Sequence, residues 1–443
     1  MLSAFLSAFR TPDLRKKLLF TAAIIALYRL GATIPSPGVS YGNVQQCIAA
    51  AENADTTGIF SLLNLFSGGA LLSLSVFALG IMPYITASII LQLLTVVIPR
   101  LEQLRKEGQS GQAKITQYTR YLTLGLAVLQ SSAFVALGQS GQLFGNACPQ
   151  GIEIIPQTAL PHWLTLVALV VTMTAGTGVI MWLGELITDR GIGNGMSILI
   201  FTSIAARLPS EGWQIATSKG AYWFVGVLVV VIAVIAAVVY IEQAQRRIPV
   251  QYAKRMIGRR MYGGTSTYIP LKVNQAGVIP VIFGSSLLYL PQLALQFTQS
   301  EDPGKVWIWV DRHLANPSDW VYILTYFLLI IFFTYFYVSI TFNPTEVADN
   351  MKKYGGFVQG IRPGKPTADY LDFILTRITL PGALYLGLIA VLPNFFFMWL
   401  GGSQYQNFPF GGTAVLIMVG VGLETVKQIE SQLMQRNYEG FLR

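Results

Sequence analysis

Few side chains in this sequence have the type and spacing that metal chemistry would need. The chain has two histidines, His162 and His313, and two cysteines, Cys47 and Cys148. These are too few for most metal sites and for a disulfide framework. The two cysteines fall in predicted outer loops, where an oxidising environment could join them, and two free thiols are equally compatible with the sequence. We expect no metal site.

The residues that phosphate chemistry requires are also missing. Gly364-Lys365 has no glycine six positions before the lysine, where a P-loop has its first glycine, and Pro366 stands where a P-loop has Ser or Thr. The triplet Gly176-Thr177-Gly178 lies inside an apolar run, so it favours close helix packing over dinucleotide binding. No nucleophile or acid–base pair forms a convincing set. The sequence therefore predicts neither an enzyme nor a cofactor.

Charged side chains are rare inside the apolar runs. Arg29 lies toward the end of the first run, and Glu185 and Asp189 lie beside Arg190, just before the Gly-rich turn at 191–195. The latter group is typical of an ion pair at a helix end. Proton relays and ion-coupled transporters normally bury Asp, Glu, Lys or His within their spans. A secondary transporter of a small solute is the alternative function, but the sequence lacks the carboxylate that it would use.

The polar and charged residues named above must be positioned by membrane-spanning helices. Of the 443 residues, 53% are hydrophobic and 12% are charged, and the mean hydropathy is +0.53. Many apolar runs approach the length of about 20 residues that crosses a bilayer as a helix. Only helices or closed barrels satisfy every backbone group in lipid, and these runs lack the alternation of a barrel. The sequence predicts an all-α, polytopic membrane helical bundle. Its ten transmembrane helices are expected at 18–34, 74–98, 118–137, 163–186, 196–206, 221–241, 273–295, 320–342, 378–400 and 411–426.

The distribution of basic residues gives the orientation. The fifth run, 196–206, is barely half the usual length, so its crossing depends on charge. If it did not cross, the basic loop from Arg246 to Lys272 would face outward, which the positive-inside rule opposes. With ten spans, only four of the 30 Lys and Arg residues lie outside: Arg207, Lys219, Lys305 and Arg312. We expect both termini in the cytoplasm.

A short apolar segment precedes the second span. Residues 59–66 are far too few to cross a membrane and are followed by Ser67-Gly68-Gly69. The pattern indicates a half-helix that ends in a glycine break. Broken helices at membrane depth occur where they are packed inside protein or line a cavity, which would imply an internal pathway. An interfacial helix that lies flat on the membrane is an equal alternative.

Two predicted cytoplasmic loops mix basic residues with apolar and aromatic ones. The first covers 246–260 and the second covers 360–365. Topology alone requires charge but not the interleaved Ile, Val and Tyr or the Pro-Gly pair, which suit a docking surface for a partner. Contact with ribosomal RNA is compatible with two basic loops on one side. The candidate partner-binding residues are Arg246, Arg247, Lys254, Arg255, Arg259, Arg260, Arg362 and Lys365.

From end to end, the chain resembles the SecY family of protein-conducting channels. The most specific motifs are Ser67-Gly68-Gly69-Ala70 and Ala78-Leu79-Gly80-Ile81-Met82-Pro83-Tyr84, then Met181-Trp182-Leu183-Gly184-Glu185, Arg190-Gly191-Ile192-Gly193-Asn194-Gly195 and Pro270-Leu271-Lys272-Val273-Asn274. The resemblance implies one membrane channel domain, 1–443. It comprises an N-terminal half (1–206), a C-terminal half (221–426) related to the first by pseudo-symmetric inversion, and a cytoplasmic tail (427–443).

The resemblance also implies roles for particular residues. The pore ring would be Ile81, Ile85, Met196, Ile200, Ile282 and Ile417, with Met196 where the family commonly has Ile. A plug at about 59–69 would include Phe60, Leu62, Leu63, Asn64, Phe66, Gly68 and Gly69. Gln92 and Asn274 would line a lateral gate between the second and seventh spans. A narrow apolar ring excludes water and ions when it is empty, without sequence preference for a passing chain.

By the same resemblance, the chain would pass unfolded secretory polypeptides across the membrane and release apolar segments sideways into lipid. The expected partners are SecE-like and SecG-like membrane subunits, the SecA motor ATPase, the ribosome, secretory and membrane precursors, and the lipid bilayer. Arg255, Arg259, Arg260 and Arg362 would face the motor or the ribosome. The expected location is the bacterial plasma (inner) membrane.

Overall fold

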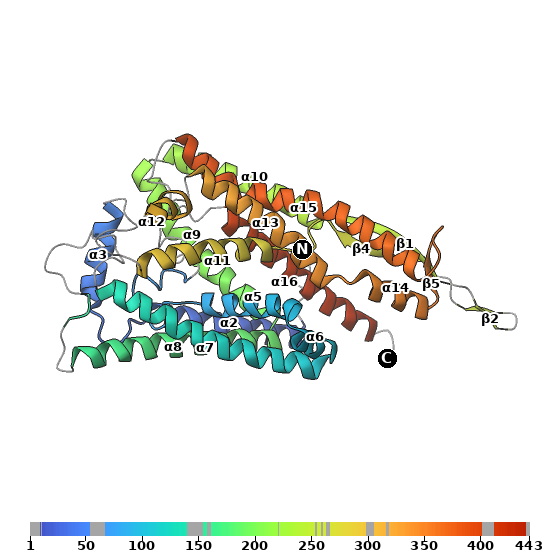
Figure 1. Ribbon diagram of the computed structural model, residues 1–443, viewed down its shortest axis with the longest axis horizontal. Coiled ribbons are helices and arrows are strands. Elements are labelled where there is room, and N and C mark those ends of the chain that lie inside the picture. Colours follow the sequence, from blue (N-terminus) through green and yellow to red (C-terminus); the bar gives the residue numbers. More distant parts are fainter. Residues whose placement is uncertain are drawn as a thin grey trace.

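The computed structural model describes most of the chain. The described residues are 9, 11–53, 67–139, 154–156, 161–219, 221–252, 255–257, 260–262, 266–297, 305–315, 319–400 and 412–439. Within these ranges the molecule is an elongated bundle whose long helices run roughly along one axis (Figure 1). A small sheet and a hairpin lie beyond one end of the bundle, and helix α3 (Tyr41–Asn53) lies at the other.

Each of the ten predicted spans coincides with a long helix in the described residues. In chain order they are α2 (Pro12–Thr33), α5 (Met82–Val97), α7 (Gln109–Gln139), α8 (His162–Arg190), α9 (Gly195–Lys219), α10 (Ala221–Gln243), α11 (Ile279–Phe297), α13 (Trp320–Thr341), α15 (Lys365–Leu400) and α16 (Gly412–Glu439). The prediction of an all-α membrane bundle is confirmed.

By length and apolar composition alone, fewer of these helices qualify as spans. Among the described residues, five helices are long and apolar enough to cross a membrane, or six if α5 and α6 (Pro99–Lys106) count as one bent span. Two shorter apolar helical stretches, Gly195–Pro209 in α9 and Ile279–Leu288 in α11, fall below that length. Lys16, Lys17 and Arg29 lower the apolar content of α2.

The second span begins later than predicted. Residues 67–81 form a series of turns, and the helix begins only at Met82. Leu74 has a φ of 44° and Gly80 a φ of 56°, which a right-handed helix does not allow. Backbone hydrogen bonds pair this stretch with the end of α2, from the Ser36 N–H to the Leu74 carbonyl (3.1 Å) and from the Val76 N–H to the Ile34 carbonyl (3.0 Å).

Several other predicted spans are shorter than the helices that contain them. The fifth span is a full helix of 25 residues that continues through Pro209 to Lys219. Helix α15 starts at Lys365, thirteen positions before its predicted span, and α16 continues into the predicted tail as far as Glu439. Polar turns at the ends of these helices carried no apolar signal, so the sequence pattern ended before the helix did.

A sheet that the sequence analysis did not predict joins the two basic loops. Strand β1 (Gln245–Tyr252) pairs antiparallel with both β4 (Ser266–Lys272) and β5 (Gly356–Val358). The hairpin β2 (Arg255–Ile257) and β3 (Arg260–Tyr262) extends beyond it (Figure 1). Ile248 and Val250 point to one side of β1 and are buried with Leu371 of α15. The short helix α14 (Pro344–Lys353) leads from α13 to β5.

At the opposite end, α3 packs on the bundle next to the short segment 154–156. The Ser40 N–H donates to the Ile154 carbonyl at 3.1 Å. Cys47 of α3 is buried and disulfide-bonded. The sequence contains one other cysteine, Cys148, which lies outside the described residues. Of the two alternatives left open by the sequence, the structure therefore favours the disulfide.

Candidate functional site

The five isoleucines of the predicted pore ring lie in one hydrophobic cluster. Ile81 precedes α5 and Ile85 lies on it, while Ile200, Ile282 and Ile417 come from α9, α11 and α16. All five are less than a tenth exposed, and Ile81 is fully buried. The cluster brings the helices before residue 206 against α11 and α16 at the centre of the bundle. We call these five isoleucines, at the joint between the two parts of the chain, the isoleucine waist.

Met196 differs from the isoleucines. Its side chain is half-buried and packs against the edge of the same cluster. The thioether lies over Gly184 of α8, where an added Cβ would come within 2.6 Å of the Met196 sulfur. An unbranched side chain can reach sideways into such a gap, which a β-branched isoleucine could not follow in the same way.

Most of the predicted plug lies outside the described residues. This applies to Phe60, Leu62, Leu63, Asn64 and Phe66. Gly68 and Gly69, at the end of the predicted plug, are described and have φ values of 66° and 93°, which favour glycine.

An intramembrane arginine holds this glycine turn. Arg29 of α2 donates from Nη1 to the Gly68 carbonyl at 3.2 Å. The next residue back, Tyr28, is fully buried and shares a 2.7 Å hydrogen bond with Ser203 of α9. Sequence analysis noted Arg29 but assigned it no partner, because its acceptor is a backbone carbonyl far along the chain.

The two predicted gate residues do not meet. Gln92 lies seven positions after Ile85, hence on the same face of α5 as the isoleucine waist, but its side chain is exposed. Asn274 precedes α11 and is buried; its amide donates to Glu242 Oε1 of α10 at 2.5 Å and to the Gly277 carbonyl at 3.1 Å. Asn274 therefore fastens the start of α11 to α10.

A cavity does lie between α5 and α11, and it opens to the surface beside the exposed Leu129 and Leu287. Its volume is about 280 Å³, and its lining is almost wholly apolar. The lining side chains come from four helices: Thr86, Ile89, Ile90 and Leu93 of α5, Leu126, Leu129, Gln130 and Ala133 of α7, Phe283, Ser286 and Leu287 of α11, and Phe333 of α13. Ser286 Oγ is buried and has no hydrogen-bond partner in the described part of the chain. Sequence reasoning missed Gln130 and Ser286, because a single polar residue in a span gives no sign of which neighbour it faces.

One hydrogen bond bridges the same joint near the sheet end of the bundle. α6 leaves α5 at an angle of 100° after Val97, and its Arg105 donates from Nη2 to the Ile340 carbonyl of α13 at 2.8 Å. This carbonyl is in the last turn of α13, where backbone acceptors lack partners within the helix. The contact joins a helix of the N-terminal part to one of the C-terminal part.

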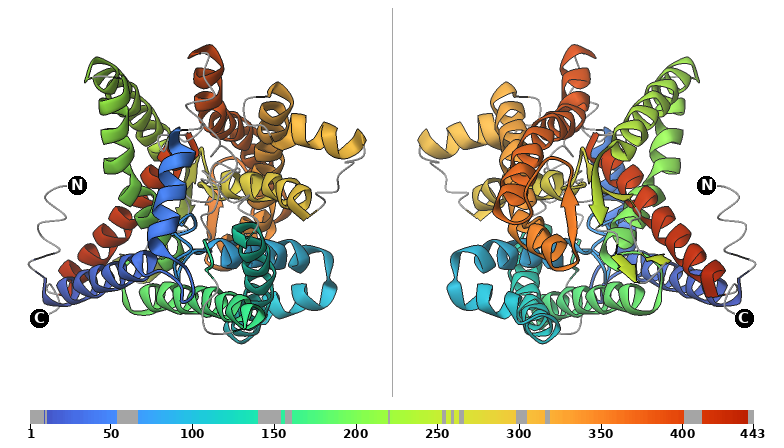
Figure 2. Two further views of the ribbon diagram at one scale, coloured as in Figure 1. Left: turned by 90° about the vertical axis from the view of Figure 1, so that its left-hand side faces the viewer. Right: turned by 90° about the vertical axis from the view of Figure 1, so that its right-hand side faces the viewer.

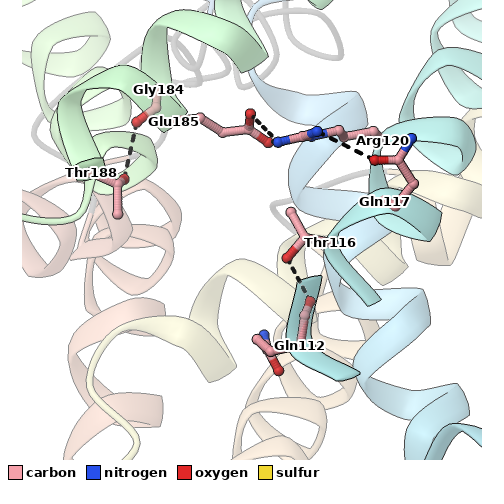
Figure 3. A network of polar contacts seen from close by, with 7 residues as sticks. All are labelled: Gln112, Thr116, Gln117, Arg120, Gly184, Glu185 and Thr188. Atoms are coloured by element: carbon pink, nitrogen blue, oxygen red, sulfur yellow. Dashed lines mark hydrogen bonds and ion pairs between the residues drawn. The ribbon is translucent and has the colours of Figure 1, made fainter. Parts of the chain in front are cut away.

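Glu185 pairs with a residue outside the group at the end of α8 that the sequence indicated. Arg120 of α7 binds the carboxylate through two nitrogens of its guanidinium group, at 2.9 and 2.8 Å (Figure 3). Gln117, one turn earlier on α7, accepts from Arg120 at 3.4 Å. A bidentate arginine contact fixes orientation as well as distance, so this pair locks α7 to α8.

The structure brings the two predicted docking loops together. Val250 of β1 lies opposite Val358 of β5, so both basic loops belong to one surface beyond the end of the bundle. Arg246 and Arg247 lie on β1, Arg255 and Arg260 lie on β2 and β3, and Arg362 and Lys365 are exposed at the start of α15. Lys254 and Arg259 lie outside the described residues. The Arg247 guanidinium stacks on the Tyr268 ring at 4.8 Å, which orders one arginine of this surface.

Comparisons with known proteins agree with this geometry. A family model described as SecY matches residues 75–426. The protein translocase subunit SecY of Streptomyces galbus is 65% identical over 447 residues and that of Mycobacterium tuberculosis is 63% identical over 448, each covering 100% of both chains.

Solved structures share the fold. One described as the structure of a protein conducting channel has a TM-score of 0.62 at 19% identity and covers 94% of this chain and 91% of its own. Another, a Sec61 channel in a canine ribosome-channel complex, has a TM-score of 0.59 at 19% identity, with the same coverage. Because the family model spans most of the chain and full-length relatives are 63% to 65% identical, the chain belongs to the SecY family.

Proposed function

We propose that this chain is the pore-forming subunit of a protein translocation channel that passes unfolded secretory polypeptides across a membrane. The observation that carries the proposal is the buried isoleucine waist at the joint between the two parts of the bundle. Relatives that match over their full length are named protein translocase subunits, which supports the proposal. A channel subunit of this kind is not an enzyme, so the energy for transport comes from partners.

The waist suits a passage for polypeptides. A narrow collar of branched apolar side chains excludes water and ions when no substrate is present, because hydrating an apolar constriction is unfavourable. The same side chains offer no hydrogen bonds or charges that would hold a particular substrate sequence. Ile81, Ile85, Ile200, Ile282 and Ile417 form this ring in our proposal, with Met196 at its edge.

The segment before the waist acts as the plug in our proposal. Residues 59–69 would block one funnel, and the hydrogen bond from Arg29 to the Gly68 carbonyl supports this by fixing the end of the segment against α2. The guanidinium group would lose this acceptor if the turn moved. An unpaired charge at membrane depth is costly, so the bond favours the resting position of the turn.

In our proposal the lateral gate lies at the cavity between α5, α7, α11 and α13. It is apolar, so an apolar segment of a substrate could replace the contacts that the four helices make with each other. About 20 apolar residues then gain more from lipid than from a wet channel, and they leave sideways. We propose Gln130 and Ser286 as the polar groups of this gate. Gln92, on the face of the waist, would line the funnel and not the gate.

Removing the unpaired hydroxyl of Ser286 should make the closed gate more stable. The Ser286→Ala change removes a buried group without a partner, a defect of about 1–3 kcal/mol, so we expect a higher unfolding temperature and poorer transport of precursors with weakly apolar signals. Ser285→Ala is the matched control, because Ser285 Oγ already donates to the Ile282 carbonyl at 2.9 Å. Equal effects of the two changes would contradict the assignment. Thermal unfolding measures the stability of each variant. Transport of a series of precursors whose signals differ in apolar content measures the effect on the gate.

The chain's surroundings are part of the proposal. We infer a bacterial plasma membrane, with both termini and the β1–β4–β5 sheet in the cytoplasm, since the basic residues gather at that end. The sheet and the β2–β3 hairpin would then dock a SecA-like motor or a ribosome. Helix α10 has a largely exposed apolar surface, including Val225, Val229 and Ile232. It suits lipid or the small SecE-like and SecG-like subunits.

Reconstitution tests this function against its alternative. Proteoliposomes that contain the complex should protect a secretory precursor from added protease only when the motor and ATP are present. We expect no saturable uptake of small solutes under the same conditions. Solute uptake without any precursor protection would instead favour a secondary transporter.

A further inference from the structure

The segment between α11 and α13 carries an apolar helix, and several of its large side chains stay exposed among the described residues. α12 (Lys305–Val310) has the sequence KVWIWV and continues into a short π-helix, η2 (Asp311–Ala315). Val306 is 72% exposed, Ile308 54% and Trp309 51%, whereas Trp307 and Val310 are half-buried. Three large apolar side chains on six residues would be unfavourable in water.

The direction of α12 distinguishes it from the bundle helices. In Figure 1 it is seen nearly end-on, while the long helices run across the view. Viewed along the long axis, the golden segment that contains α12 extends sideways from the bundle (Figure 2, left). A helix perpendicular to the spans lies parallel to the membrane plane. It is also at the end of the molecule away from the sheet.

α12 lies near the start of α13, and the exposed face of α13 is apolar. α13 begins at Trp320, which is 66% exposed, and the exposed residues Leu324, Leu328 and Phe332 follow it at intervals of four. This interval places them on one face of α13, which therefore faces lipid. Tryptophan is enriched where a span meets the membrane–water interface. Trp309 packs on His313, which contacts Asp319 next to Trp320, so α12 lies close to the start of this lipid-facing surface.

Charged groups near α12 divide into two sets. Lys305 at its start and Arg312 after its end are exposed, so both cations are free to reach phosphate groups. His313 already has partners: its Nδ1 lies 2.5 Å from Asp319 Oδ2, and Trp309 packs on its ring. The Val321 N–H, helped by His313, keeps the pKa of Asp319 below its usual range. Asp319 also caps α13 through that N–H. The His313–Asp319 contact, which we call the His313–Asp319 clasp, therefore fastens η2 to the start of a span.

We propose that α12 is an interfacial anchor that inserts into one leaflet of the bilayer. Val306, Ile308 and Trp309 enter the region between headgroups and acyl chains, and Lys305 and Arg312 bind lipid phosphate groups. The occupant of this surface is lipid. Under the topology of the proposed function, it is the outer leaflet, although insertion itself depends only on the membrane-spanning fold.

The anchor acts on the gate helices. Leu314 of η2 packs against the cluster that contains Leu288 of α11 and Tyr322 of α13, and the His313–Asp319 clasp holds η2 to α13. Insertion of α12 into the leaflet therefore fixes the position of the outer ends of α11 and α13 relative to the membrane surface. Both helices line the gate cavity, so the anchor keeps this wall of the gate level with the interface.

Depth-dependent quenching tests the anchor in the full chain with its co-purified subunits. A fluorophore is attached at Ile308→Cys, and the complex is placed in vesicles of phosphatidylethanolamine and phosphatidylglycerol. The vesicles carry a quencher either near the headgroups or deep in the acyl chains. Leu328→Cys, in the middle of α13, is the control for deep lipid. Tyr354→Cys, 78% exposed beside the sheet, is the control for water. Labelling without reductant spares the disulfide-bonded Cys47, and wild-type protein corrects for other labelling.

We expect the label at Ile308 to be quenched strongly by the shallow quencher and weakly by aqueous iodide. The label at Leu328 should respond to the deep quencher, and the label at Tyr354 to iodide alone. Iodide quenching at Ile308 equal to that at Tyr354 would overturn the proposal, as would protection of Ile308 from all quenchers, which would indicate a covering protein. Precursor transport measured on the same vesicles separates this outcome from failure of the proposed function.

A second variant links the signal to the exposed side chains. With the label moved to Lys305→Cys, replacing Val306 and Ile308 together by serine should strongly reduce the shallow quenching. These side chains are exposed, so the unfolding temperature should stay unchanged. Unaltered shallow quenching in this variant would contradict insertion through α12.

Discussion

Replacing Ile200 and Ile282 together by glycine should make vesicles that contain this chain leak ions in the absence of substrate. Both residues are buried in the central waist, on helices from different parts of the chain. Removing their side chains opens space at the constriction, and an apolar constriction that becomes wider can hold water and conduct. Ion flux through proteoliposomes or planar bilayers measures the effect. We also expect faster transport of precursors with weak signals, because the closed state loses contacts.

Loss of stability alone could cause leakage, so the control must be equally destabilised. Ile323 and Ile330 of α13 are also buried, but they lie in a second cluster away from the waist. Truncation of a buried isoleucine to alanine costs about 2–5 kcal/mol, and glycine costs more, so both double variants should unfold at lower temperature. Only the variant with changes at the waist should leak. Equal ion leakage from both double variants would contradict the claim that the isoleucine waist seals the channel.

A single methyl group on Gly176 should have the second largest effect. An added Cβ would lie 2.0 Å from the Val76 carbonyl oxygen, a distance at which the backbone must move. Val76 belongs to the turns at 67–81 that lead into Ile81. Overpacking of this kind typically costs about 1–3 kcal/mol. We expect Gly176→Ala to lower the unfolding temperature and to raise the ion leak by displacing the waist.

The neighbouring glycine provides the control. On the same helix, a Cβ at Gly178 would meet its nearest atom, Leu124 Cδ2, at 3.7 Å, which is an ordinary contact. Alanine in the middle of a helix is favoured over glycine by about 0.5–1 kcal/mol. Gly178→Ala should therefore be neutral or stabilising and should not leak. Unfolding in detergent and ion flux distinguish the two; a tolerated Gly176→Ala would mean that α8 does not hold this segment.

The spans could be predicted from sequence because lipid imposes a simple rule. Each apolar run coincided with a helix, and the basic loop at 246–272 supported the crossing of the fifth run. The close packing expected from Gly176-Thr177-Gly178 is confirmed at Gly176, where the backbone of another segment fits against α8. The isoleucines named by resemblance do share one cluster. Their role as a pore ring stays a prediction.

Features set by distant contacts could not be predicted in the same way. The backbone at Leu74 and Gly80 leaves the helical region because residues 67–81 pair with α2, while their composition is as apolar as that of a helix. The sequence groups Glu185 and Asp189 with Arg190 at one helix end, whereas the partner of Glu185, Arg120, lies on another helix. Which span residues face the gate depends on helix rotation, and rotation is fixed only by packing.

Trapping a substrate tests the central claim most directly. A photoreactive residue is placed at Ile85 or Ile282 in the waist, or at Val229 on α10, which is 59% exposed on the outside of the bundle. A secretory precursor is then stalled halfway through the reconstituted complex. We predict crosslinks to the precursor from both waist positions and none from Val229. Crosslinks that are absent at the waist, or equally strong at Val229, would contradict a polypeptide path through the isoleucine waist.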